Sequence, residues 1–220
     1  MTTLPGCSPS AGRRCPGWSR WGRGVRRYHR PVPTLDELAA TVRGCTRCRL
    51  AEGRTQTVFG MGDPCADLVF IGEGPGAEED RQGVPFVGRS GQLLDRLIGE
   101  ELGITRDAVY ICNVTKCRPP NNRDPLPDEV AACSPYLAQQ LELIAPKVIV
   151  TLGNFATRVV LRTNEGITKL RGAVHEADGR VVVPTFHPSA ALRGGGAVLT
   201  AMRADLVRAK QALGDGAARR

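Results

Sequence analysis

The sequence predicts an α/β protein of three layers, in which helices cover both faces of a central four-stranded parallel sheet. The first observation is a set of four short apolar runs, each bounded by glycine or polar residues. Such continuous runs are typical of strands that are buried on both faces. The second observation is that segments of helical periodicity separate the runs. Alternation of strand and helix favours a parallel sheet.

The four expected strands lie in the central part of the chain. They read "DLVFIGE", "VYICNV", "KVIVTLG" and "VVVPTFH", at residues 67–73, 109–114, 147–153 and 181–187. In a doubly wound sheet, ligands bind at the carboxyl ends of the strands. A functional site is therefore expected where these four runs end.

The first expected helix follows Thr34, whose hydroxyl can cap it, and ends before Gly44. The other helical segments lie between or after the strands, at residues 90–102, 127–145, 154–161 and roughly 197–213. They supply the outer layers of the predicted fold.

The ends of the chain differ in composition from its centre. The first thirty residues hold seven arginines and no acid, among many Gly, Pro and Ser. We expect a disordered basic leader over 1–32, or a start assigned too far upstream, then one folded domain over 33–213 and a flexible tail over 214–220. After residue 30, 23 basic residues face 22 acidic ones, so the net charge of +8 does not by itself indicate a nucleic-acid partner. No apolar run reaches the roughly 18 residues of a membrane span, so no membrane partner is expected.

The stretch "GEGPGAEEDRQGVPFVGRSG", residues 72–91, is rich in glycine and acid. It fits neither the phosphate-binding loop nor the dinucleotide fingerprint, and its carboxylates would repel a phosphate. Its backbone can still approach a flat ligand closely, and Phe86 could stack on one. The stretch therefore predicts a slot for a base. The alternative is a structural loop with Phe86 in the core.

Four of the eight cysteines suggest a metal site. Cys45 and Cys48 form "CTRC", while Cys117 and Cys133 stand far from it in "KCRPPNNRDP" and "AACSP". Reduced thiolates of this number could hold zinc or an iron–sulfur cluster. The spacing does not select the two distant partners, so unpaired buried cysteines remain the alternative.

The stretch "PTFHPSAALRGG" places His187 directly after the fourth strand. An imidazole at a strand end could donate a hydrogen bond to an oxygen that becomes negative during a reaction. Leu192 could act as an apolar wedge between bases, and Arg193 could contact a phosphate.

Three stretches together, "GEGPGAEEDRQGVPFVGRSGQLLD", "ICNVTKCRPPNNRDP" and "HPSAALRGG", closely resemble the family 4 uracil-DNA glycosylases over roughly residues 35–210. The resemblance implies the uracil-DNA glycosylase fold and release of uracil from DNA as the first step of base excision repair. It also implies a [4Fe–4S] cluster on Cys45, Cys48, Cys117 and Cys133.

The same resemblance implies roles for the strand-end residues. Glu73 and Gly74 line the first motif, Phe86 stacks on uracil, Asn113 reads its polar edge and His187 stabilises negative charge at O2. Asn113 can accept from N3–H and donate to O4, whereas cytosine reverses this pattern.

One departure concerns the attacking water. In the family 1 enzymes a carboxylate occupies the position of Gly74 and orients this water. We expect Glu73 to do so here, with Glu79, or no general base at all, as alternatives. Leu192 and Arg193 would wedge the duplex while the base is out of the stack.

The expected product is an abasic site, since only Lys116 lies near the strand ends as a candidate for lyase chemistry. The resemblance also implies a monomer that is cytoplasmic, associated with DNA, and active on single- or double-stranded substrate. Two rivals stay open: a cluster-bearing module that binds DNA or transfers electrons without cutting, and a zinc-stabilised nucleotide-binding protein.

Overall fold

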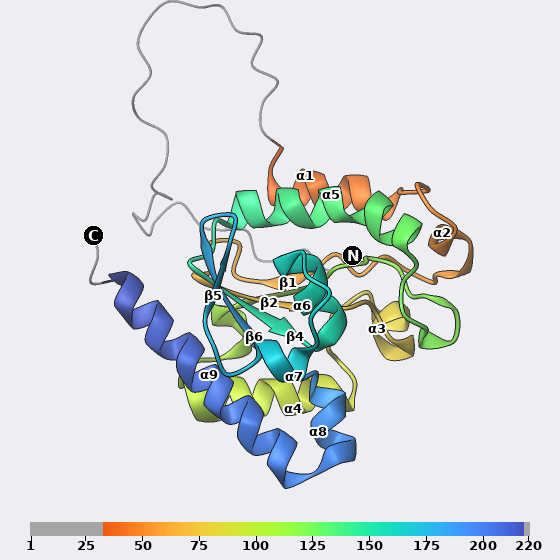
Figure 1. The fold of residues 1–220 in the computed structure, drawn as a ribbon. Helices are drawn as coiled ribbons and strands as arrows, with labels where there is room; N and C mark the ends of the chain where they lie inside the picture. The colour runs from red at the N-terminus through yellow and green to blue at the C-terminus, as the bar shows by residue number, and fades with distance from the viewer. Residues whose placement is uncertain (1–32, 218–220) are drawn as a thin grey trace, which may run out of the picture. The chain divides into compact units, whose positions relative to one another are not determined.

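The structure is a computed structural model and describes residues 33–217 (Figure 1). The predicted leader at 1–32 and the last three residues, 218–220, lie outside the described residues. The described part is built on one sheet of six strands in the order β1-β3-β2-β4-β6-β5.

The centre of this sheet confirms the four predicted strands. They are β2 (Leu68–Gly72), β3 (Tyr110–Asn113), β4 (Val148–Leu152) and β6 (Arg180–Thr185). Each pairs in parallel with its neighbour, so all four carboxyl ends lie at one edge of the sheet. This edge is where the sequence places its candidate residues.

The sheet extends beyond the four predicted strands. Two short edge strands, β1 (Met61–Gly62) and β5 (His175–Ala177), pair antiparallel to β3 and β6 and make the sheet mixed. Neither contains an apolar run, and none of their residues is buried. Their pairing is fixed by the neighbouring strand and by the turns, which the hydrophobic pattern does not reveal.

The three-layer arrangement is confirmed by the side chains of β2, which alternate between the two faces. Leu68 and Phe70 pack in one cluster with residues of α4, α8 and α9, whereas Val69 and Ile71 pack in a second cluster with residues of α5 and α6. These helices are α4 (Arg89–Leu97), α8 (Pro188–Gly194), α9 (Gly196–Ala217), α5 (Pro127–Ile144) and α6 (Asn154–Leu161).

A third, smaller cluster joins α1 (Leu35–Arg43) to α5, which run side by side in Figure 1. Thr34 begins α1 as predicted: its hydroxyl accepts from the Glu37 N–H while the Glu37 carboxylate accepts from the Thr34 N–H. Cys133 and Tyr136 of α5 belong to this cluster, so it lies beside two of the cysteine-bearing segments.

Three predicted elements differ in their bounds or in their type of helix. The segment 90–102 is α4 followed by a π-helical turn, Ile98–Leu102. The acidic stretch after β2 is not a continuous loop, because it contains α3 (Ala77–Gln82), which ends at Gly83 with φ of 73°. The helix α9 extends to Ala217, beyond the expected domain boundary at 213.

The remaining short helices are α2 (Leu50–Gly53), α7 (Ile167–Leu170) and two 3₁₀ turns, Arg106–Ala108 and Pro120–Asn122. Among the described helices, none combines the length and the apolar character that a membrane span requires.

Candidate active site

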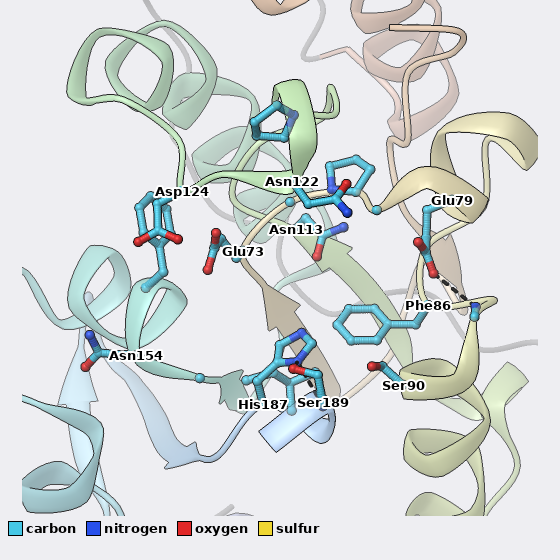
Figure 2. Close-up of a pocket in the computed structure, with 18 of the residues that line it drawn as sticks. Glu73, Glu79, Phe86, Ser90, Asn113, Asn122, Asp124, Asn154, His187 and Ser189 are labelled. Carbon is cyan, nitrogen blue, oxygen red and sulfur yellow. Dashed lines mark hydrogen bonds between the residues drawn. The ribbon is translucent and has the colours of Figure 1, made fainter. Parts of the chain in front are cut away.

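A cavity of about 770 Å³ opens at the carboxyl ends of the four central strands. Its wall includes Glu73 after β2, Asn113 at the end of β3, Gly153 after β4 and His187 after β6. Phe86 closes one side from the segment between α3 and α4 (Figure 2). The cavity therefore collects residues that are far apart in the sequence at the edge where parallel sheets bind ligands.

The ring of Phe86 lies against the end of β2 because residue 72 has no side chain. A Cβ at Gly72 would come within 2.7 Å of the Phe86 ring and 2.4 Å of Asn113 Oδ1. Phe86 is only 6% exposed and belongs to a core cluster, yet it lines the cavity. Phe86 thus packs in the core, as the alternative predicted, and also borders the cavity, while its stacking on a base stays a prediction.

The backbone around Phe86 is held by charged side chains. Arg106 donates to the carbonyls of Pro85 and Phe86 and also to Asp95. The carboxylate of Glu79 accepts from two backbone N–H groups just after Phe86, both at 3.0 Å. These bonds hold Phe86 in a left-handed conformation, with φ of 52°, that a residue with a side chain rarely adopts. Glu79 is therefore engaged in shaping the loop.

Asn113 points its amide into the cavity and has an unpartnered oxygen. The residue is 2% exposed, and its Oδ1 has no hydrogen-bond partner among the described residues. Its backbone is fixed, because Asn113 pairs with Gly72 in the sheet and its carbonyl accepts from Lys116 Nζ at 2.7 Å. A buried polar atom without a partner costs about 1–3 kcal/mol, so this position favours a ligand that brings an N–H group.

His187 caps α8, a helix that is absent from the predicted elements. Its Nδ1 accepts from the backbone N–H of Ser189 at 3.1 Å and lies 2.8 Å from the Ser189 hydroxyl. An Nδ1 that accepts leaves the proton of a neutral imidazole on Nε2. Burial, aided by nearby Arg193, lowers the pKa of His187 to about 4. The ring is therefore a neutral donor at physiological pH.

The ring of His187 lies beside that of Phe86. The two ring centroids are 5.7 Å apart with an interplanar angle of 31°. The two rings border the space into which the amide of Asn113 points (Figure 2). A Cβ at Gly153 would come within 2.9 Å of the His187 Cβ, so glycine at the end of β4 makes room for the imidazole.

Glu73 lies beside a further carboxylate of the cavity wall, Asp124 (Figure 2). Burial, together with the charge of Asp124 and a hydrogen bond between the two side chains, raises the pKa of Glu73 to about 7. The backbone of Glu73 is fixed because its carbonyl accepts from the Thr115 N–H at 3.0 Å. Glu73 therefore has a fixed backbone and changes its protonation state near neutral pH.

The other predicted contacts divide into two groups. Gly74 and Arg193 line the cavity, and a Cβ at Gly74 would come within 2.6 Å of Thr115 Oγ1. Leu192 lies outside the lining on α8, with 44% of its side chain exposed. Two arginines of the loop after Cys117 differ in the same way, since Arg118 lies outside the lining, whereas Arg123 lines the cavity and forms an ion pair with Glu129.

The four candidate cysteines line a second, much smaller cavity beside α1 and α5. Arg54 Nη1 donates to Cys117 Sγ at 3.2 Å, and the Lys116 N–H donates to Cys133 Sγ at 3.3 Å. In the described part of the chain, no group of three or more His, Cys, Asp or Glu side chains is arranged to hold a metal ion. The donors that already point at sulfur, and the softness of four thiols, fit a thiolate-bound metal group.

Cys112 lies apart from this set, as a fully buried residue of β3 in the core cluster of the α5 face. Lys116 is buried against the cysteine cavity and does not line the larger one.

The polar residues of the large cavity that the sequence did not reveal include Asp124, Asn154 and Ser189. Ser189 stands two residues after His187 and could have been found if His187 had been recognised as the cap of a helix. Asn154 follows the end of β4 and could have been found by the strand-end rule. Asp124 had no such signal, because it stands eleven residues after the end of β3.

Comparison with known proteins agrees with this geometry. The model of the "Uracil DNA glycosylase superfamily" matches residues 59–211. The chain is 47% identical over 169 residues to the type-4 uracil-DNA glycosylase of Sulfurisphaera tokodaii, which covers 73% of this chain and 77% of that protein. It is 50% identical over 161 residues to the type-4 enzyme of Thermotoga maritima, over 72% of this chain and 83% of that protein.

A more distant relative is the type-5 uracil-DNA glycosylase of Pyrobaculum aerophilum, which is 33% identical over 181 residues, 80% of this chain and 70% of that protein. The type-4 relatives share more of their sequence with this chain, and the family model spans all four central strands. The chain belongs to the type-4 family of the uracil-DNA glycosylase superfamily.

Proposed function

We propose that the protein hydrolyses the N-glycosidic bond of deoxyuridine in DNA, releasing uracil and leaving an abasic site, as the first step of base excision repair. The family membership supports this activity. The observation that carries it is the unpartnered Oδ1 of Asn113, buried beside two rings at the end of β3. Uracil supplies a flat ring that fits beside these two rings and an N3–H donor for the unpartnered oxygen.

Recognition then divides among three residues. Phe86 stacks on the base that has left the helix, and Asn113 accepts from N3–H and donates to O4. Cytosine has the opposite donor and acceptor at these two atoms, so binding it would leave both sides unsatisfied. The close approach of ring and amide at Gly72 sets the width of the slot.

Catalysis concerns the charge that forms when the C1′–N1 bond breaks. The electron pair leaves with the uracil ring, and the negative charge reaches O2. His187 Nε2–H donates to that oxygen as a neutral imidazole, which needs no proton from solvent because its pKa is about 4. Glu73, in its ionised form, orients the water that attacks C1′.

Lysine chemistry has no support at this site. Lys116 is buried and donates to the Asn113 carbonyl, away from the lining of the large cavity. We infer a monofunctional enzyme whose product is an intact abasic strand.

The small cavity is the site that would hold a [4Fe–4S] cluster, through Cys45, Cys48, Cys117 and Cys133. When bound, such a cluster supplies a cross-link between the segment 45–54 and the loop 117–133. Arg54 and the Lys116 N–H would then hydrogen-bond to its thiolates.

The DNA partner is uracil-containing single or double strand, bound by a monomer within the cell. Arg89, Arg123, Arg158 and Arg193 line the cavity from four different segments and could contact phosphates. Leu192, exposed on α8, is placed to fill the gap that a flipped nucleotide leaves in a duplex.

An excision assay tests the proposal. Oligonucleotides with one uracil are incubated with the protein and treated with alkali, and cleavage at uracil is expected, with none for matched cytosine or thymine strands. Asn113→Ala should slow excision about 5–150-fold, the cost of roughly 1–3 kcal/mol for lost hydrogen bonds. An alkali-stable uracil strand after long incubation with the wild-type protein would exclude the function.

A further inference from the structure

The loop between Cys117 and Cys133 brings a second carboxylate to the reaction site. The stretch after β2 carries Glu73 followed by Gly74, and its other cavity carboxylate, Glu79, is bonded to backbone N–H groups. Asp124 enters the same cavity from another segment and lies beside Glu73 (Figure 2). We propose that Asp124 is a positioning residue that holds Glu73 in place when Glu73 takes the proton of the attacking water. This role rests on the proposed function.

The position of Asp124 is built into the fold. Arg123 Nη1 donates to the Asp124 carbonyl at 2.9 Å and to Glu129 Oε2 at 2.8 Å, and its Nη2 donates to Glu129 Oε1 at 2.6 Å. The Glu129 side chain is fully buried at the start of α5. The Leu126 N–H also donates to Glu129, at 2.8 Å. One buried carboxylate therefore fixes the backbone on both sides of Asp124.

The backbone carbonyl of Glu73 is equally fixed, because it accepts from the Thr115 N–H, and Asp124 is close enough to raise the pKa of Glu73. Two adjacent carboxyl groups can share a hydrogen bond only while one of them holds a proton. The protonated form of Glu73 donates to Asp124, and the ionised form is free to accept from water. The pair therefore links the orientation of Glu73 to its protonation.

The step balances with water as the second reactant. The C1′–N1 bond breaks with its electron pair on uracil, and the water oxygen forms a bond to C1′. The water proton goes to ionised Glu73, where Asp124 accepts a hydrogen bond from it. Glu73 then returns this proton to solvent, and the uracil anion takes one from solvent.

Other charged groups around the cavity do not explain the protonation of Glu73 near pH 7. Arg89, Arg123, Arg158 and Arg193 line it as cations, which would favour the ionised form, and Glu79 is bonded to backbone N–H groups beside Phe86. His187 is neutral well above pH 4. Burial and Asp124 are the causes that raise the pKa of Glu73 to about 7.

The test is the pH profile of single-turnover excision at saturating enzyme, so that DNA affinity does not enter. The wild-type rate should fall on acidification through about pH 7, because ionised Glu73 is the active form. Asp124→Asn keeps a group that can bond Glu73 but removes the charge, so the midpoint should move down by on the order of one pH unit. The rate at pH 6 should then rise about fivefold, as the ionised fraction of Glu73 grows from about one tenth to about one half.

Asp124→Ala removes the bond as well, so its rate at pH 8.5 should be lower than that of Asp124→Asn. The matched control is Asp128→Asn, which removes an exposed carboxylate on α5 that pairs with Arg49 and does not line the cavity. Its profile should follow the wild type. A purely structural role for Asp124 would lower the rate without moving the midpoint.

Glu73→Gln separates the role of Glu73 from the role of Asp124. If it excises uracil at the wild-type rate, the water-orienting role of Glu73 fails, and this inference fails with it. If it is slow while Asp124→Asn keeps the wild-type midpoint, the role of Glu73 stands and the inference about Asp124 is overturned. Equal rates for Asp124→Asn and Asp124→Ala at pH 8.5 would also contradict it.

Discussion

The two cavities of this protein differ in size and in chemistry, although Asn113 lines one and Lys116, three residues later, lines the other. The strand-end cavity is large and polar, and it leaves a buried amide oxygen without a partner. The cysteine cavity is small, and backbone and guanidinium N–H groups already point at two of its sulfur atoms. The difference indicates that the first is completed by a ligand that comes and goes, and the second by a group that stays.

The comparison predicts that the strand-end cavity can lose much of its activity with only a moderate loss of stability. His187→Ala removes the donor to O2, and loss of one such donor typically costs about 2.7–4 kcal/mol, or 100–1000-fold in rate. Single-turnover excision should fall by this factor while DNA affinity stays close to wild type, and loss of the cap on α8, about 0.5–2 kcal/mol, should lower the melting temperature by roughly 1–8 °C. Less than a tenfold loss would remove His187 from the chemistry.

The opposite result is expected at the cysteine cavity. Cys117→Ala should abolish the brown colour of a bound cluster and lose a cross-link worth about 2–4 kcal/mol, which lowers the melting temperature by roughly 4–16 °C. The matched control is Cys112→Ala, a core cysteine that does not line the cavity and should keep the colour. A colourless Cys117→Ala protein with wild-type stability and activity would show that the site does not tether the loop.

A smaller effect on the rate is expected from Leu192, which lies outside the lining of the large cavity. Leu192→Ala should slow excision several-fold from duplex DNA, where unstacking costs a few kcal/mol, and leave single-stranded DNA nearly unaffected. Val207→Ala, on α9 and similarly exposed at 38%, is the control and should change neither rate. An equal loss on both substrates would rule out a wedge.

The smallest expected effect concerns the stability cost of Glu73. A carboxyl whose pKa rises from 4.5 to about 7 on folding destabilises the protein progressively as the pH rises through that range. Glu73→Gln removes this cost, so its melting temperature should exceed that of wild type by roughly 2–4 °C at pH 8, about 1 kcal/mol, and by almost nothing at pH 4. A constant difference at both pH values would contradict the pKa shift.

Much of the site could be predicted because strand ends converge in a parallel sheet. Asn113 and His187 stand at the ends of apolar runs that are largely buried, and such runs give a clear signal of position. Phe86 could be assigned to the slot, but its left-handed backbone could not, since it depends on Arg106 from a distant turn. The edge strands β1 and β5 could not be predicted, because two or three residues are too few to show a hydrophobic pattern.

Asp124 shows where sequence reasoning stops. It sits between a basic residue and a proline in a loop whose composition reads as solvated. Asp124 is held at the cavity by the ion pair between Arg123 and buried Glu129, and by Cys117 and Cys133 on either side of it in the chain. Contacts between side chains that are distant in the sequence fix this path, and a local pattern does not record them.

The segment from Asn113 to Cys117 has a further consequence. All five residues are buried, and Lys116 joins the two sites, with its Nζ on the Asn113 carbonyl and its backbone N–H on Cys133. So short and enclosed a segment leaves little room for one end to move without the other. A displacement of Cys117 or Cys133 would therefore also displace Asn113, the residue proposed to read the base.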